Sequence, residues 1–236
     1  MKKSHIATLT VFFVLIPLTL IVGSRLSGRA FYVTSTLVIV ELLIPFFLAF
    51  EGRRPQAREL VVLAVMCALA VAGRVAIPIP SFKAIFGIIM IAGIAFGPES
   101  GFLVGAISAL ASNFFYSQGP YTPWQMMAYG AGGMLAGFVF AEGRLPRKPV
   151  IMGIFGFLAV AFFVGPLLDT CSVFLVMSRI SLKGAMAFYI SGFPVNLRQA
   201  VATAIVLLVL GKPLLEKLDR IKTKYGILDD EGRKEA

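Results

Sequence analysis

The chain has 236 residues, of which 58% are hydrophobic and only 14% are charged, and its mean hydropathy is +0.88. Soluble domains are about 45–50% apolar and about 25% charged, so much of this chain has to face lipid. The net charge of +10 does not indicate nucleic-acid binding, because the basic residues lie in short clusters between apolar runs, as at membrane boundaries.

Eight apolar runs are long enough, or nearly so, to cross a bilayer as helices of about 20 residues. They lie at approximately 6–23, 31–50, 59–77, 84–97, 100–116, 122–141, 150–176 and 188–211. We therefore predict an all-α membrane bundle of about eight transmembrane helices. A cleaved signal peptide is the alternative for the first run, although this run is long for one and lacks a clear cleavage site.

The basic residues predict the orientation of the bundle. With the N-terminus in the cytoplasm, fifteen Lys and Arg residues fall in cytoplasmic segments and five in outer segments, the bias that the positive-inside rule describes. We therefore expect a multi-pass plasma-membrane protein with both termini in the cytoplasm. It divides into two N-terminal helices (1–52), a six-helix core (53–211) and a basic tail (212–236) that can form an amphipathic helix on the membrane surface.

Catalytic chemistry is poorly supported by the polar residues. The only histidine, His5, is N-terminal, and Cys67 and Cys171 lie inside apolar runs. Histidine-based metal sites and Ser-His-Asp or Cys-His constellations are therefore excluded from the core, and the sequence has no P-loop. We predict that the chain is not an enzyme and carries no ATPase of its own.

Small residues recur at helical spacing in several runs. Ala64, Ala68 and Ala72 lie on one face of the 59–77 run, where small side chains let another helix approach closely. From the spacing alone, packing within the chain and docking of a partner helix both remain open. Similar small faces are formed by Gly101, Gly105 and Ala109, and by Gly133 and Gly137.

A proline-rich loop with aromatic and amide residues, SQGPYTPWQM, joins the 100–116 and 122–141 runs. Its prolines stiffen it, and Tyr121 and Trp124 suit a membrane interface. One interpretation is an aromatic belt at a tight turn. The other is the rim of an outward-opening pocket, for which Asn113, Gln118 and Gln125 provide polar groups.

Charged residues within the runs also favour a polar cavity. Arg74, Asp169 and Arg198 all fall in the outer half of the predicted bundle, and such charges are costly unless they face a cavity or a partner. An Asp169–Arg198 ion pair between two helices is the structural alternative, and both interpretations are compatible. Glu41 lies in the middle of the second run, and the sequence assigns it no role.

Residues 59–137 resemble the core of the substrate-binding S-components of energy-coupling factor (ECF) vitamin transporters. The shared features are the alanines at every fourth position, the Gly97-Pro98 break and the loop GPYTPWQM. The segment GFPVNLRQAVAT, 192–203, resembles the start of the last helix in the same subgroup, so the similarity covers roughly residues 59–220. The family has six core helices, and it does not explain the two N-terminal runs.

The resemblance implies that the chain binds a vitamin and then joins a membrane coupling subunit and two ATP-binding subunits. ATP is used by those partners, and no cofactor is expected in this chain. The alanine face Ala64, Ala68 and Ala72 would dock on the coupling subunit. The expected substrate-binding residues are Arg74, Asn113, Gln118, Tyr121, Trp124, Gln125, Asp169, Asn196 and Arg198.

The loop is most similar to the cobalamin-type subgroup, so cobalamin is the expected substrate. Thiamine, riboflavin, folate and queuosine precursors remain open. Two other classes also remain, a self-contained secondary transporter coupled through Glu41 or Asp169 and an intramembrane enzyme. Expressed alone, an S-component binds its ligand without accumulating it, whereas a secondary transporter accumulates it and an enzyme converts it.

Overall fold

The computed structural model describes residues 56–140, 143–177 and 181–226, and in the N-terminal part Leu15, Leu18, Thr19, Val33, 36–41, Leu43 and Ile44. The helices of the core are α4 (Ala57–Val75), α5 (Ile85–Phe96), α6 (Pro98–Tyr116), α7 (Thr122–Phe140), α8 (Pro149–Ala159), α9 (Gly165–Val176), α10 (Leu182–Val206) and α11 (Lys212–Tyr225). Short π-helical segments, Val160–Val164 and Leu207–Gly211, join α8 to α9 and α10 to α11.

The predicted all-α fold is confirmed for this part of the chain. Two continuous helices, Pro149–Val176 (28 residues) and Leu182–Tyr225 (44 residues), are long and apolar enough to cross a membrane. The predicted runs at 6–23 and 31–50 fall largely outside the described residues, so the count of eight spans stays a prediction. The other six runs each correspond to one helix or one continuous pair of helices.

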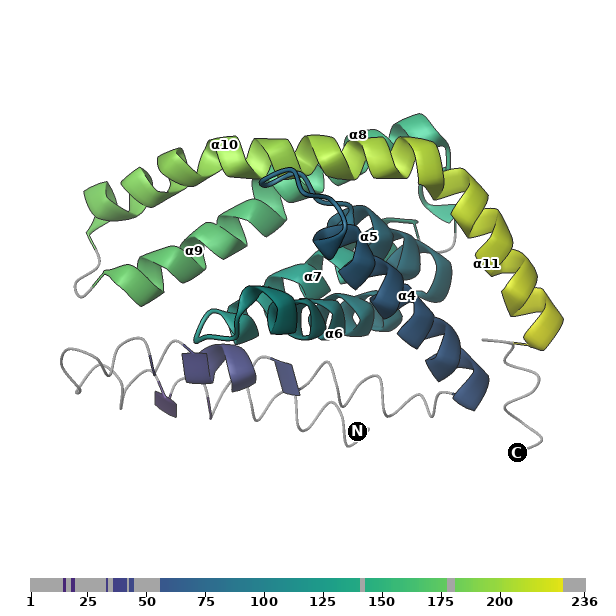
Figure 1. The fold of residues 1–236 in the computed structure, drawn as a ribbon, viewed down its shortest axis with the longest axis horizontal. Helices are drawn as coiled ribbons and strands as arrows, with labels where there is room; N and C mark the ends of the chain where they lie inside the picture. Colours follow the sequence, from purple (N-terminus) through teal and green to yellow (C-terminus); the bar gives the residue numbers. More distant parts are fainter. Residues whose placement is uncertain are drawn as a thin grey trace.

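α5 is the central helix of the core (Figure 1). All twelve of its residues are buried, which explains why this short run has apolar residues on every side. The helix ends at Gly97, whose positive φ of 94° is a conformation that glycine adopts without steric cost. Pro98 is the next residue and begins α6. The predicted Gly-Pro break between the two helices is confirmed.

Glycines let α5, α6 and α7 approach to backbone contact. A Cβ atom added at Gly101 would lie 2.5 Å from the carbonyl oxygen of Gly133, and one added at Gly137 would lie 2.7 Å from Cα of Pro98. Gly93 and Gly105 face backbone atoms of α7 in the same way. These small faces therefore pack within the chain, where close approach supplies the dispersion energy that lipid cannot.

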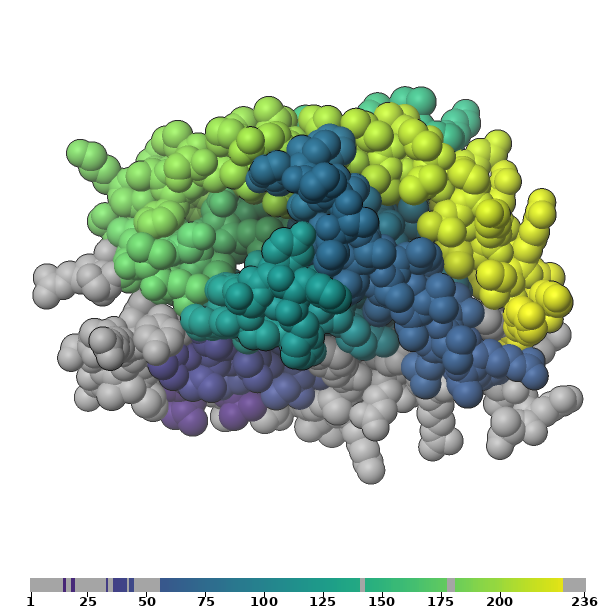
Figure 2. All heavy atoms as spheres, viewed as in Figure 1, coloured from purple at the N-terminus to yellow at the C-terminus, as the bar shows by residue number. Residues whose placement is uncertain are grey.

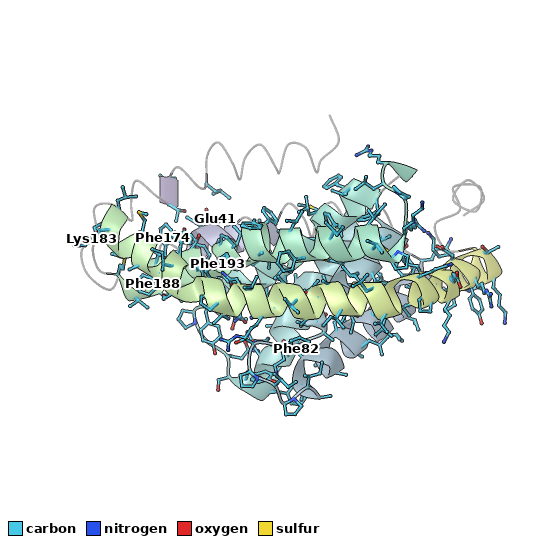
Figure 3. The ribbon with its side chains drawn as sticks, turned by 90° about the horizontal axis from the view of Figure 1, so that it is seen from above. Glu41, Phe82, Phe174, Lys183, Phe188 and Phe193 are labelled. Atoms are coloured by element: carbon cyan, nitrogen blue, oxygen red, sulfur yellow. The ribbon has the colours of Figure 1, made fainter. Side chains whose placement is uncertain are left out.

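α10 and α11 form one long helix across the core, which bends toward its C-terminal end (Figures 1 and 3). It begins earlier than predicted, because the Ser181 side chain caps it by accepting a hydrogen bond from the Gly184 amide at 3.1 Å. Helix α10 continues through the π-helical segment Leu207–Gly211 into α11. Leu215 and Leu218 of α11 are buried, so the first part of the basic tail packs on the core as well as presenting a polar face.

The two ends of the bundle differ in character. At one end, Arg147 donates to the carbonyl of Ile94 at 3.1 Å, and Lys222 donates to the carbonyl of Ala95 at 2.7 Å. These cations satisfy and neutralise the C-terminal carbonyls of α5. The opposite end carries the α4–α5 loop and the α6–α7 loop, together with the last turn of α9 and the first turn of α10 (Figure 1). The basic end is the one that the sequence assigns to the cytoplasm, and that orientation stays a prediction.

Candidate substrate pocket and exposed alanine face

A cavity of about 530 Å³ lies at the less basic end of the bundle, within the range of about 300–1,000 Å³ that is usual for small-molecule sites. Figure 2 shows the molecule hollowed between the green α9–α10 part and the blue and teal loops of the α4–α7 part. Its polar and aromatic lining residues include Arg74, Lys83, Phe86, Tyr116, Tyr121, Gln125, Tyr129, Asp169, Asn196 and Gln199.

Arg74, in the last turn of α4, forms one corner of this cavity. Its Nη1 donates to Oδ1 of Asn113 at 2.9 Å and also to Oγ of Ser112. The guanidinium carbon lies 4.9 Å from the centre of the Tyr116 ring and 5.6 Å from that of Tyr129. These hydrogen bonds and cation–π contacts fix the guanidinium in place, so it presents a preoriented positive charge to the cavity.

Asn113 connects this corner to α7. Its side chain is fully buried, and Nδ2 donates to Oε1 of Gln125 at 2.8 Å and to Oγ1 of Thr122 at 3.2 Å. Because the Gln125 oxygen accepts this bond, its Nε2 group remains available as a donor toward the cavity. Gln118 holds the same loop, since Nε2 donates to the Leu110 carbonyl at 3.0 Å and Oε1 accepts from Thr122 at 2.9 Å.

Asp169 of α9 and Asn196 of α10 form the opposite wall. Nδ2 of Asn196 donates to Oδ2 of Asp169 at 2.7 Å. Gly192 allows this pairing, because a Cβ atom there would collide with the Asp169 carboxylate. The cavity thus has a cationic wall on α4 and a carboxylate-amide wall on α9 and α10, and tyrosine rings lie at its rim.

Four of the nine predicted residues do not line the cavity: Asn113 and Gln118, which hold its walls from behind, and Trp124 and Arg198. Trp124 is buried beside Phe174, with ring centres 5.4 Å apart, and it supports the wall from behind. Arg198 is exposed. Two helical positions differ by about 200° around the axis, so Asn196 faces Asp169 while Arg198 points away. The anticipated Asp169–Arg198 ion pair is therefore absent, and the Asp169 carboxylate is satisfied by an amide instead.

Sequence reasoning missed several lining residues. Tyr129 follows Gln125 of α7 and Tyr121, the residue directly before α7, at four-residue intervals, so this spacing was a usable signal that the three lie on one side. Gln199 similarly lies one turn after Asn196. Lys83 gave no signal, because it sits in the loop before α5 and its position depends on a hydrogen bond to the carbonyl of Ile77.

The alanine face lies on the outside of α4. Ala64, Ala68 and Ala72 are all exposed among the described residues. Beside them, an apolar groove of about 490 Å³ runs between α4 and α6. Its lining residues are Cys67, Ala68, Val71, Ala72, Val75, Ala111 and Phe115. The glycine faces are used inside the bundle, whereas this small-residue face is left uncovered by the described part of the chain.

A family model described as "ECF-type riboflavin transporter, S component" matches residues 55–216. The chain belongs to this family. The match begins just before α4 and ends inside α11, so it covers α4 to α10 completely and the first residues of α11. Searches among curated proteins and among solved structures gave no match.

Membership of the family confirms the resemblance to S-components. An S-component is the substrate-binding subunit of an ECF transporter for a vitamin, it is not an enzyme, and it works with a transmembrane coupling subunit and ATPases. The family description names riboflavin, and the match gives no support to cobalamin. The first 54 residues of this S-component lie outside the match, and the predicted division into two N-terminal helices and a six-helix core stays a prediction.

Proposed function

We propose that this chain is the subunit that captures riboflavin in the cavity between α4, α7, α9 and α10 and then delivers it through a coupling subunit docked on the alanine face of α4. The main observation behind the proposal is the cavity, because it combines tyrosine rings with a fixed guanidinium on one side and a carboxylate-amide pair on the other. The family description supports the substrate class.

The chemistry of riboflavin matches these groups. Its flat heteroaromatic ring system can pack on tyrosine rings. The ring carbonyls are acceptors for the Arg74 guanidinium and for Nε2 of Gln125. The hydroxyl groups of its ribityl chain both donate and accept, which suits the Asp169 carboxylate and the Asn196 amide. Size agrees as well, since a vitamin of this class suits a cavity of about 530 Å³.

Cobalamin is the second candidate, because the loop GPYTPWQM is similar to that of the cobalamin-type subgroup. A corrinoid with its nucleotide arm is several times larger than riboflavin, so it would project well beyond this cavity. The described residues also offer no histidine to ligate cobalt. Both points favour the smaller and flatter ligand.

The exposed position of Ala64, Ala68 and Ala72 supports the docking role. Helix pairs in membranes approach closely through small residues at this spacing, and the adjoining apolar groove adds contact surface for a partner helix. Two ATP-binding subunits would supply the energy for transport, and this chain would need no cofactor of its own.

The direct test is titration of the purified full-length chain in detergent with riboflavin, whose fluorescence is quenched when the ring stacks on an aromatic side chain. Saturable quenching that excess thiamine or cobalamin does not displace supports the proposal. Absence of quenching, together with saturable cobalamin binding, would replace riboflavin by the second candidate. Accumulation of ligand in vesicles that contain this chain alone would indicate a secondary transporter.

A further inference from the structure

A short segment before the matched core lies against the back of the pocket wall. Its residues 36–41, Leu43 and Ile44 are helical. Figure 3 shows Glu41 toward the same end of the molecule as Phe174 and Lys183, and on the opposite side of α10 from Phe82. The family match starts only at residue 55, so this contact is an addition to the S-component core.

Three positions of this segment face the core at one-turn intervals. Oγ1 of Thr36 donates to the carbonyl of Pro120 at 3.4 Å. Ile39 is buried in a cluster with Trp124 and Cys171, and Leu43 is buried with Phe102 and Ala106. Positions 36, 39 and 43 share one helical face, so this face is the one that packs on α6, α7 and α9.

The opposite side of the segment faces the preceding part of the chain. There, Thr19 donates to Oε1 of Glu41 at 2.6 Å. Leu37 and Val40 are exposed, as expected for positions that point to lipid. The segment is therefore oriented by a polar contact on one side and by the Ile39 cluster on the other.

The Ile39 cluster lies directly behind two walls of the pocket. Cys171 lines the cavity from α9, beside Asp169. Trp124 lies next to Gln125, which lines it from α7. Ile39 contacts the cluster that joins these two helices, so its volume influences how far apart they stand.

Thr36 contacts the α6–α7 loop at the rim of the same pocket, through its hydrogen bond to Pro120. Pro120 precedes Tyr121, whose hydroxyl donates to the Ser117 carbonyl at 2.8 Å. Ser117 has a φ of 80°, a left-handed conformation that costs a residue with a side chain about 1–3 kcal/mol and persists only where neighbours hold it. The contact with Thr36 is one of the constraints on this loop.

We propose that Ile39 and Thr36 are positioning residues of the ligand site: they hold the α7–α9 wall and the α6–α7 loop in the geometry that binds the ligand. The proposal rests on the assignment of the ligand site to this cavity. It gives the N-terminal segment a role in affinity, in place of a role in membrane anchoring alone.

The test uses the full chain with Cys67→Ala, so that Cys171 is the only thiol, and Trp124 is the only tryptophan. Ile39→Ala should shift the Trp124 emission and speed the labelling of Cys171 by a small methanethiosulfonate several-fold. Riboflavin affinity should fall about tenfold. Leu37→Ala, an equally apolar truncation on the exposed face, should change none of the three, and Ile39→Leu should restore them.

The proposal is wrong if Ile39→Ala and Leu37→Ala show the same Trp124 emission, the same rate of Cys171 labelling and the same riboflavin affinity. It is also wrong if Ile39→Ala changes the labelling rate of Cys171 but leaves the riboflavin affinity unchanged. Should Ile39→Ala fail to fold, Thr36→Val keeps the side-chain size and removes only the donor. The riboflavin affinity of Thr36→Val, compared with that of Leu37→Ala, then decides whether the segment positions the ligand site: a lower affinity in Thr36→Val supports the proposal, and equal affinities contradict it. If the unaltered chain does not bind riboflavin, the proposed substrate is wrong, and emission and labelling alone decide whether this segment holds the wall.

Discussion

Arg74 donates a hydrogen bond to Asn113 across 2.9 Å, which ties the last turn of α4 to the end of α6 beside the pocket. The same helix exposes Ala64, Ala68 and Ala72 on its outer surface. One helix therefore carries both the cationic corner of the ligand site and the proposed docking face. A displacement of α4 on docking would move the guanidinium, which gives a direct physical route from partner binding to ligand release.

Arg74→Lys should weaken ligand binding by about tenfold to a hundredfold. A lysine keeps the charge but loses the planar fork that contacts Ser112 and Asn113 together and lies over two tyrosine rings. The measurement is riboflavin affinity in detergent by fluorescence quenching. Arg58→Lys, at the other end of α4, is the matched control and should leave affinity unchanged. Equal affinities for the two variants would remove Arg74 from the site.

Gly192→Ala should also weaken binding, although residue 192 does not line the cavity. The added methyl group would collide with the Asp169 carboxylate and displace it from the amide of Asn196. Ser191→Ala, one residue earlier and exposed, is the control. A loss of affinity in Gly192→Ala with normal expression supports the carboxylate-amide wall, whereas unchanged affinity would show that Asp169 does not need this position.

Gly101→Ala should destabilise the fold by about 1–3 kcal/mol, the usual cost of an extra methyl group in a packed interior. The new Cβ would lie 2.5 Å from the backbone oxygen of Gly133, and a helix backbone cannot yield as a flexible side chain can. The midpoint of thermal unfolding in detergent measures this effect. Ile107→Ala on the outer side of α6 should lower the midpoint much less.

The core helices could be predicted from the sequence because lipid-spanning runs are visible in hydropathy alone. It was harder to predict which side of each helix faces the protein interior and which faces lipid. A helix with protein on one side and lipid on the other is apolar on both, so the sequence did not show that Asn196 faces inward and Arg198 outward. The position of Trp124 had the same ambiguity, and only the packing of α7 against α9 distinguishes the pocket lining from its support.

The continuity of the helix from α10 into α11 was not predicted, for a related reason. The last apolar run ends at residue 211, and the basic segment that follows was assigned to a tail on the membrane surface. In the structure, the π-helical segment Leu207–Gly211 joins α10 to α11, and the helix continues. Leu215 and Leu218 then reach the core, a tertiary contact that local sequence does not reveal.

Ala68→Trp should abolish ATP-driven uptake by the assembled transporter while the isolated chain still binds its ligand. Ala68 lines the apolar groove beside α4, and an indole there would hold a partner helix away and forfeit its dispersion contacts. Ala68 lies on the exposed side of α4, six residues or about 9 Å along the helix before Arg74, so affinity in detergent should be retained. Leu69→Trp, a neighbouring exposed position, is the control for bulk alone.

Cys67 offers an independent measure of the same contact, because it lines the groove. In a Cys171→Ala background, assembly with the coupling subunit should slow the modification of Cys67 by a small thiol reagent, and Ala68→Trp should remove this protection. If Ala68→Trp abolishes ligand binding along with uptake, the α4 face packs within the chain. If assembly leaves the modification of Cys67 unchanged while uptake persists in Ala68→Trp, the coupling subunit docks on a different surface, since a helix that approaches this closely cannot accommodate an indole at Ala68.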